Sequence, residues 1–259
     1  MSLKYDHISA LPFNIDKDVP IFIDTEDTGL DILKDRPFCL PISVLGKEYV
    51  VPWDDMAIMW LEEYMPQAKY VGGFHLKFDI HMLRNGGISQ KTIDNSNFLC
   101  GMLREQLIDE HKHSYALQTI AAERRIGSKD ISLYQKLAEI FGGVPDETQM
   151  AKVHKAPVDV IIPYAKQDVL LHRQVIDRQE YDIKSQSLEK VQALEMEVLK
   201  TLVDLEYRGC PVNPDAHHDA ALNIRDLVDV IDEELTQMVG YRINVNSSKW
   251  MRYAFKVLG

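Results

Sequence analysis

Four acidic residues occupy positions where a folded chain would bring their side chains together. Asp24 and Glu26 follow residues 19–23, a short β-branched and apolar run that predicts a buried strand. Because the two acids are two residues apart, their side chains leave an extended chain on the same face. Asp79 lies near the start of a predicted helix that follows a strand, and Asp168 lies within a later predicted helix. Acids at strand ends and on a helix facing the sheet are typical of sites for hard cations.

A tyrosine precedes the last of these acids by about one helical turn. Tyr164 and Asp168 are four residues apart, so their side chains share one face of a helix. Each feature alone is weak, because an isolated Asp-x-Glu pair is more often solvated surface and such a tyrosine is more often simply packed. Their order along the chain and their places on the predicted elements favour one shared site. Magnesium suits it, since this ion takes oxygen ligands, keeps several waters and serves phosphate chemistry.

The overall charge points away from nucleic acid, whereas the placement of the acids points towards it. With 29 Lys and Arg residues against 40 Asp and Glu residues, the formal net charge is −11. This charge argues against a protein that holds nucleic acid by bulk electrostatics, and alone it favours a small-molecule enzyme. Cations held by the four acids would offset part of this charge at the place where the acids meet.

Length and cysteine usage bound the class of protein. The 259 residues predict one large domain, or one domain with a substantial appendage. Cys39, Cys100 and Cys210 lie far apart, which disfavours a disulfide framework and a structural zinc site and fits a reducing cytoplasm. No apolar run reaches the roughly 18 residues that a membrane span requires, and we expect neither a signal peptide nor a membrane partner.

Apolar periodicity and turn residues predict an α/β fold. Beyond residues 19–23, strands are predicted at 38–44, 47–51 and 70–73, with Leu45-Gly46 as a turn. Helices are predicted at about 55–64, 77–84, 97–107, 114–125, 131–140, 158–180, 188–207, 214–239 and 248–258. The alternating part gives way to continuous helices near residue 185, where we place a domain boundary. The expected architecture is a mixed β-sheet flanked by helices, with a helical extension.

The four acids and Tyr164, in this order and on these elements, resemble the three exonuclease motifs of the DEDD superfamily. A tyrosine four residues before the last acid is typical of its DEDDy branch. DEDDh members carry a histidine nearby instead, and residue 163 here is Pro. The resemblance implies an RNase H-like fold with a mixed sheet.

The resemblance extends over roughly residues 18–259. Residues 24–31, 73–83 and 94–117 are similar to the proofreading domain of bacterial DNA polymerase I and its phage relatives. Residues 195–214 and 244–249 resemble the opening of the polymerase part of family A enzymes, although no palm or fingers follow. We therefore expect an exonuclease domain at 1–185 and a helical, polymerase-like segment at 186–259.

The resemblance also implies a two-metal-ion mechanism, with Mg²⁺ or Mn²⁺. Two cations roughly 3.5–4 Å apart neutralise the charge that grows on the leaving oxygen and activate a water. Asp24, Glu26 and Asp168 are assigned to one metal, and Asp24 bridges to the second. Asp79 holds the second metal, and Tyr164 orients the attacking water.

Contacts with the substrate strand are implied for Thr25, Leu30, His75 and Phe78. Leu30 matches the apolar residue that wedges between the last two bases in this family. The alternative for Leu30 is a loop leucine that packs on its own domain. Phe78 supports the helix that carries Asp79. His75 stands where the family has Asn; it can hydrogen-bond to the strand, with an altered affinity or a lower activity as the consequence.

The implied function is a 3′–5′ exonuclease that releases nucleoside monophosphates from single-stranded DNA 3′ ends, as the proofreading part of a family A DNA polymerase. Its partners would be that 3′ end and a polymerase domain or separately encoded polymerase chain, in the cytoplasm of a bacterium or phage-infected host. Two alternatives stay open. One is an RNA-processing exonuclease of the RNase D group, against which residues 195–214 count. The other is an inactive subunit that docks on a polymerase, against which the four intact acids count.

Other candidate groups have plainer explanations. The histidine pairs at 111/113 and 217/218 lack a Cys or acid at ligand spacing, so we expect solvated side chains. His172, one turn after Asp168, is expected to be a packed or exposed helix histidine as readily as a site residue. Four cations lie beyond residue 234 with no acid among them: Arg242, Lys249, Arg252 and Lys256. They either meet a duplex backbone or a polymerase portion, or form the solvated face of an amphipathic helix.

Overall fold

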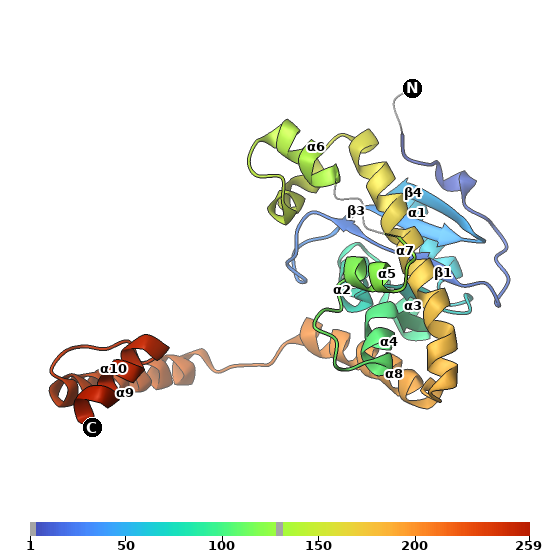
Figure 1. The fold of residues 1–259 in the computed structure, drawn as a ribbon. Helices are drawn as coiled ribbons and strands as arrows, with labels where there is room; N and C mark the ends of the chain where they lie inside the picture. Colours follow the sequence, from blue (N-terminus) through green and yellow to red (C-terminus); the bar gives the residue numbers. More distant parts are fainter. Residues whose placement is uncertain (1–3, 128–131) are drawn as a thin grey trace. The chain divides into compact units, whose positions relative to one another are not determined.

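The computed structural model describes residues 4–127 and 132–259 and divides the chain into two compact units (Figure 1). Unit 1 is Met1–Arg208 and unit 2 is Gly209–Gly259. The helix that follows residue 185, α8 (Glu189–Arg208), packs against α2 (Leu76–Asn85) and belongs to unit 1. The chain therefore divides later than the sequence analysis places its boundary. The assignment of 1–185 to an exonuclease and of 186–259 to a polymerase-like segment stays a prediction.

Unit 1 is built on a six-stranded mixed sheet. Its order is β2-β3-β1-β5-β6, and β4 also pairs with β3. β1, β5 and β6 are parallel to one another, whereas β3 is antiparallel to β1, β2 and β4. The strands are β1 (Ile21–Ile23), β2 (Glu26–Asp27), β3 (Pro37–Val44), β4 (Lys47–Pro52), β5 (Val71–Gly73) and β6 (Phe98–Cys100). The sheet confirms the predicted α/β class.

The strand that carries the first two acids is interrupted between them. In β1, Ile23 lies opposite Ile42 of β3, and in β2, Glu26 lies opposite Cys39 of the same strand. Between these two ladders, the Asp24 N–H still donates to a β3 carbonyl at 3.1 Å. The chain thus continues along β3 but leaves the regular ladder at the residues that predict the site.

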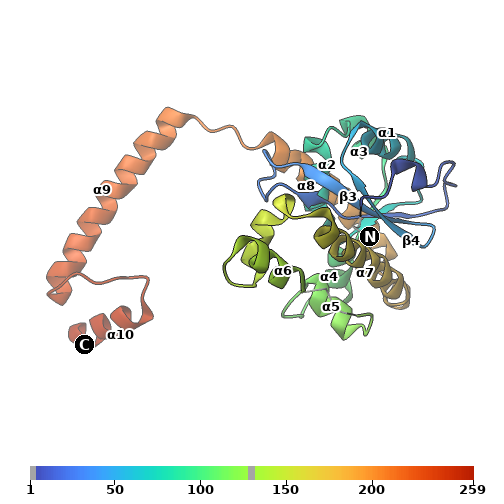
Figure 2. The ribbon, with the colours of Figure 1, turned by 90° about the horizontal axis from the view of Figure 1, so that it is seen from above.

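Helices cover both faces of the sheet. In Figure 2, α1, α2, α3 and α8 lie on one side of the strands, and α7 lies on the other. Three helices, α4, α5 and α6, pack against α7, which also contacts β1, β3, β4 and β5. Their bounds are α1 (Asp55–Tyr64), α3 (Gln90–Asn95), α4 (Gly101–Ile108), α5 (Leu117–Glu123), α6 (Ser132–Phe141) and α7 (Val158–Ser185). Two 3₁₀ segments complete the described part of unit 1: η1 (Ile8–Ala10) and η2 (Glu147–Lys155).

Local sequence signals explain several of these boundaries. The Asp54 side chain accepts from the Ala57 N–H and so caps α1, as its place before the helix predicts. Leu45 and Gly46 both have positive φ, 51° and 77°, which is the backbone of a two-residue β-hairpin turn. One buried stripe on α7, at spacings of four and seven residues, comes from Ile161, Ala165, Val169 and Ile176. Amphipathic spacing therefore places α7 flat on the sheet.

The structure corrects the prediction of one helix over residues 97–107. Phe98–Cys100 forms β6 at the sheet edge, and α4 begins only at Gly101. All three β6 residues are buried, so neither alternation nor a polar face marks the strand. α5 is shorter than its predicted range, and α3 and η2 are not predicted at all. Ile131, the first residue of another predicted helix, lies outside the described residues, and α6 follows it.

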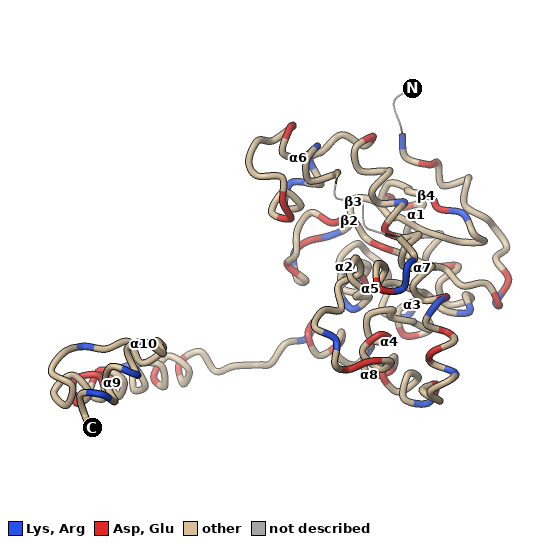
Figure 3. Tube along the Cα trace, in the orientation of Figure 1, with Lys and Arg blue, Asp and Glu red and all other residues tan. Residues whose placement is uncertain are grey.

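Unit 2 consists of α9 (Pro214–Val239) and α10 (Ser248–Leu258). The Asn213 side chain caps the start of α9, and Gly240, at a φ of 89°, ends it. Val239, Ile243 and Ala254 form a small core between the two helices. Acids gather on α9, and Lys and Arg on α10 (Figure 3). Among the described residues of both units, no helix is long and apolar enough to cross a membrane.

Candidate active site

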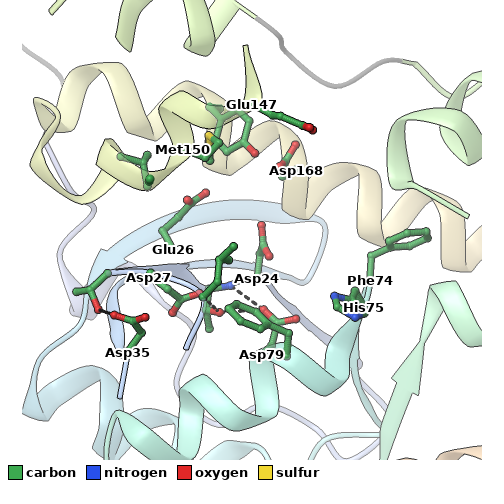
Figure 4. Close-up of a pocket in the computed structure, with 18 of the residues that line it drawn as sticks. Asp24, Glu26, Asp27, Asp35, Phe74, His75, Asp79, Glu147, Met150 and Asp168 are labelled. Carbon is green, nitrogen blue, oxygen red and sulfur yellow. Dashed lines mark hydrogen bonds between the residues drawn. The ribbon is translucent and has the colours of Figure 1, made fainter. Parts of the chain in front are cut away.

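A cavity of about 680 Å³ lies in unit 1 where the break between β1 and β2 faces α2, η2 and α7 (Figure 4). Nine residues singled out from the sequence all line it: Asp24, Thr25, Glu26, Leu30, His75, Phe78, Asp79, Tyr164 and Asp168. They come from segments that are up to 144 positions apart in the chain, from residue 24 to residue 168. The fold thus brings together every residue of the predicted site.

The acids line this cavity from the sheet, from α2, which carries Asp79, and from α7. Asp24 and Glu26 extend from the sheet, and Asp168 faces them from α7 (Figure 4). Glu26, Asp79 and Asp168 are buried, with exposed fractions of 5%, 3% and 1%. Burying ionised carboxylates is costly unless they are paired, hydrogen-bonded or bound to a cation. The burial of these three acids therefore indicates a functional site rather than ordinary packing.

Thr25 joins the strand break to α2. Its backbone N–H donates to Asp79 Oδ1 at 2.9 Å. Its hydroxyl lies 3.0 Å from the same oxygen and 2.8 Å from Asp27 Oδ2, and its single proton can be donated to either acceptor. These bonds fix the orientation of Asp79 relative to Asp24, which precedes Thr25 in the chain.

A buried histidine joins the same strand end to α7. His172 is 3% exposed, and its Nδ1 donates to the Ile23 carbonyl at 3.1 Å. Ile23 directly precedes Asp24, and His172 lies one helical turn beyond Asp168. The histidine is therefore a packed residue, which is one of the two sequence expectations. Its hydrogen bond connects α7, which carries Asp168, to the end of β1, which precedes Asp24.

Burial and the proximity of several acids raise the pKa values of groups in the cavity. Burial raises the pKa of Asp79 well above its usual value, and the neighbouring Asp24 and Asp27 raise it further. Burial raises the pKa of Asp27 to about 7. The pKa of the Tyr164 phenol is raised too, by burial and then by Asp168, so this hydroxyl keeps its proton at neutral pH.

His75 has the backbone conformation that its place at the start of α2 demands. It lies in the left-handed region, with a φ of 57°, a region in which Asn and His are both enriched. Its ring stacks on Phe78, with ring centres 6.4 Å apart and planes 4° apart. Burial, followed by the charge of Lys77, lowers the pKa of His75, so the ring is neutral at neutral pH. This histidine thus meets a backbone requirement that asparagine would also meet.

Leu30 sits on a loop that is pinned from within. The Asp35 carboxylate accepts from the Thr28 hydroxyl and the Asp31 N–H, both at 2.8 Å. A Cβ at Gly29 would lie 2.4 Å from the Asp35 side chain, so any larger residue there would displace the carboxylate that pins the loop. Leu30 itself is 85% exposed. The alternative that Leu30 packs on its own domain is therefore wrong.

Three acids that line the cavity are missed by sequence reasoning: Asp27, Asp35 and Glu147. Asp27 directly follows the Asp-x-Glu pair, and its place beside Thr25 is a signal that could be read from the sequence. Asp35 and Glu147 lie on loop and 3₁₀ segments with no periodic pattern, so nothing in the sequence relates them to the site.

Seven of the described lining residues are acidic and none is Lys or Arg. Carboxylate oxygens are the donors that Mg²⁺ and Mn²⁺ prefer, and a buried acidic cavity of this kind fits such ions. As the side chains lie, no three described His, Cys, Asp or Glu residues converge as a metal-binding group. The chain thus supplies suitable donors around a cavity rather than a completed coordination shell.

Sequence comparison relates the chain to phage DNA polymerases. It is 33% identical over 247 residues to "DNA polymerase DpoZ" of Acinetobacter phage SH-Ab 15497, covering 93% of this chain and 39% of that protein. It is 31% identical over 241 residues to the DpoZ of Salmonella phage PMBT28, covering 91% and 38%. The chain therefore spans less than two fifths of the length of these relatives. No model of a known protein family matches the chain.

Two solved structures share the fold. Brucella melitensis NrnC bound to pGG matches with a TM-score of 0.55 and 18% identity, over 73% of this chain and 85% of that one. The POL domain of Pol1 from M. smegmatis, in complex with DNA primer-template and dNTP, matches with a TM-score of 0.66 and 13% identity. This second match covers 92% of this chain and 37% of that one. The chain is thus similar to part of certain phage DNA polymerases, and its fold is that of the RNase H-like nucleases.

Proposed function

We propose that unit 1 is a two-metal-ion 3′–5′ exonuclease of DEDDy type, which removes nucleoside monophosphates from DNA 3′ ends. The observation that carries this proposal is the single cavity lined by Asp24, Glu26, Asp79, Tyr164 and Asp168. The similarity to phage DNA polymerases and the nuclease fold support a nucleic-acid-processing enzyme. A solved neighbour with bound Mg²⁺ supports the use of a divalent cation. Within a family A polymerase, in the cytoplasm of a bacterium or phage-infected host, this activity would serve as proofreading.

The four acids would hold the cations, which supply charge neutralisation at the leaving oxygen and a bound water of lowered pKa. The side chains of the protein itself would position the attacking water and the metal ligands. Tyr164 keeps its proton because of burial and nearby carboxylates, so its hydroxyl can donate and accept hydrogen bonds while it orients the attacking water. Asp79 is held in place by Thr25.

Four further contacts would position the DNA strand. Leu30 extends from a pinned loop and is exposed, as a side chain that wedges between the terminal bases must be. The neutral ring of His75, stacked on Phe78, offers a nitrogen donor and a flat face beside the cavity. Thr25 completes this set at the strand break.

The test is hydrolysis of a single-stranded DNA oligonucleotide labelled at its 5′ end, with Mg²⁺ or Mn²⁺ and with a chelator. We expect a ladder that shortens from the 3′ end only when a divalent ion is present. Asp24→Ala and Asp168→Ala should abolish it, while Glu197→Ala, at an exposed acid of α8, should not. Near-wild-type hydrolysis by either site variant would refute the assignment.

Two other functions are separated by the same assay. Faster degradation of an RNA oligonucleotide than of the matching DNA would favour an RNA-processing exonuclease. The absence of any metal-dependent hydrolysis, together with capture of a polymerase chain, would favour an inactive docking subunit. Buried carboxylates gathered around one cavity support an active enzyme.

A further inference from the structure

Besides its apolar stripe, helix α2 has one face that lines the cavity and a second, polar face that does not. Phe78 and Asp79 line the cavity. Lys77, His81 and Arg84 follow the spacing i, i+4, i+7, so they share another face. Lys77 and Asp79 are about 200° apart around a helix with 3.6 residues per turn. The residues on this second face therefore do not line the cavity, and their polar groups must find hydrogen-bond partners elsewhere.

That second face is bound by the last turns of α8. Glu206 accepts from Lys77 Nζ at 2.5 Å through one carboxylate oxygen, and the other oxygen lies 2.9 Å from His81 Nε2. An ionised carboxylate only accepts hydrogen bonds, so His81 Nε2 carries the proton and donates. His81 is 1% exposed. One glutamate thus holds two residues that flank Asp79 in the sequence.

A second contact strengthens the same junction. Arg84 Nη2 donates to Asp204 Oδ1 at 2.8 Å, and its guanidinium lies over the Tyr207 ring, 4.3 Å from the ring centre. The Arg84 side chain is only 8% exposed. A buried, ion-paired and stacked arginine resists sliding of one helix past the other. The contacts of α2 with α8 therefore extend over about two helical turns, from Lys77 to Arg84.

Apart from the bonds between Thr25 and Asp79, the start of α2 has no side-chain cap. Its N-cap residue, His75, makes no capping hydrogen bond with its side chain. The pocket residues of α2 lie in its first turn, next to this uncapped end. Lys77 and Glu206 hold that first turn directly, whereas Arg84 and Asp204 act near the other end.

We propose that Glu206 is a positioning residue for the exonuclease site, and that it sets the place of Asp79 and Phe78 by clamping the first two turns of α2 through Lys77 and His81. The inference rests on the proposed function, since it names a residue that serves the same cavity. Glu206 does not line the cavity and would touch neither DNA nor metal. Its effect passes along α2 to Asp79, and from there to the hydrogen bonds that Thr25 makes.

The test uses the full chain with Glu206→Gln, which keeps the size of the side chain and removes its charge, and with Glu206→Ala. The matched control is Glu197→Gln, also on α8, where the acid is 69% exposed and pairs with Lys200 at 3.2 Å. Positioning groups behind an active site typically change activity or metal affinity by about 10–100-fold. We expect Glu206→Ala to lower kcat within this range, Glu206→Gln to lower it less, and KM to change by less than threefold. The control should match wild type.

A readout without metal or DNA separates positioning from mere stability. The Thr25 amide donates to Asp79, so its backbone NMR signal reports the position of that carboxylate. We expect it to shift in Glu206→Gln and in Lys77→Met, and to stay in place in Glu197→Gln. A wild-type kcat with an unmoved Thr25 signal in both Glu206 variants would overturn the proposal, even if the melting temperature falls. A chain with no exonuclease activity at all would refute the proposed function, and the Thr25 signal would still decide whether Glu206 positions Asp79.

Discussion

The Thr25 backbone N–H and hydroxyl both approach one oxygen of Asp79, at 2.9 and 3.0 Å. A strand end and a helix start, 54 positions apart in the chain, are thereby fixed to each other at the cavity. Burial raises the pKa of Asp79, and these hydrogen bonds act in the opposite direction because they favour the ionised form. The relationship is specific enough to test by substitution.

Thr25→Val should weaken the site without abolishing it. Valine keeps the shape and the backbone N–H but removes the hydroxyl, so the bond that this hydroxyl shares between Asp79 and Asp27 is lost. A hydrogen bond to a charged group contributes about 1.5–3 kcal/mol, and we expect kcat to fall by about tenfold. Thr25→Ser, which keeps the hydroxyl, should remain close to wild type. Equal rates for the valine and serine variants would contradict this role of the hydroxyl.

Asp79→Asn should stabilise the protein when no divalent ion is present. The pKa of the native carboxyl is raised first by burial and then by repulsion from Asp24 and Asp27, and a neutral amide avoids both costs. In chelator at neutral pH, we expect the melting temperature to rise by a few degrees, at about 2–4 °C per kcal/mol for a domain of this size. Added Mg²⁺ should stabilise wild type by mass action and the variant much less. Calorimetry with and without Mg²⁺ measures both effects, and a lower melting temperature for the variant in chelator would count against them.

Tyr164→Phe should slow turnover rather than abolish metal binding. The ring is 3% exposed and packs in a cluster formed by β3, β4, α6, η2 and α7, so phenylalanine fills the same space. Loss of a group that orients the attacking water should lower kcat by roughly 10²–10⁴-fold. Titration calorimetry with Mn²⁺ should give a dissociation constant within a few-fold of wild type. Wild-type turnover would exclude Tyr164 from the reaction.

His172→Leu should reduce both stability and activity. Leucine leaves the buried Ile23 carbonyl without its donor, at a cost of about 1–3 kcal/mol. Because that bond joins α7 to the strand end before Asp24, we also expect a lower kcat. His172→Asn provides the comparison, since a side-chain amide can donate again. A variant that is destabilised but has a normal kcat would show that the bond serves stability alone.

The contribution of Glu206 to stability should depend on pH. Its hydrogen bond from Lys77 lowers its pKa below the usual 4.5. A lowered acid pKa adds stability that is present above the unfolded-state pKa and is lost as pH falls through the folded-state value. The melting-temperature difference between wild type and Glu206→Gln should therefore be steady above about pH 5 and shrink in more acidic buffer. Because the carboxylate is 35% exposed, we expect a small difference. A difference that grows on acidification would contradict the assignment.

The sequence predicts most of the elements because their signals are local. The cap residue Asp54, the turn at Leu45 and Gly46, and the long apolar stripe of α7 each indicate one boundary or one face. β6 escapes prediction because three buried residues have no alternation, and its identity depends on β5 beside it. A strand that is defined by its pairing with another strand can be identified only from the folded structure.

The candidate site follows a similar division. The acids that follow a strand or share a helix face with a tyrosine can be picked out in advance, and all of them line the cavity. Asp35 and Glu147 cannot, because loop packing alone brings them there. Glu206 is separated from Lys77 by 129 positions. Only helix packing, which no motif encodes, joins them.

The acidic lining of the cavity has a consequence for the order of events. Seven lining residues are acidic and, within the described part of the chain, no lysine or arginine lines the cavity. A phosphate backbone entering this space meets repulsion until cations are bound. We therefore expect ordered association, with the divalent ion entering before the DNA end, and a Kd for DNA that weakens steeply as free Mg²⁺ is lowered. Through this ordering, free Mg²⁺ would control access to the site as well as the chemistry within it.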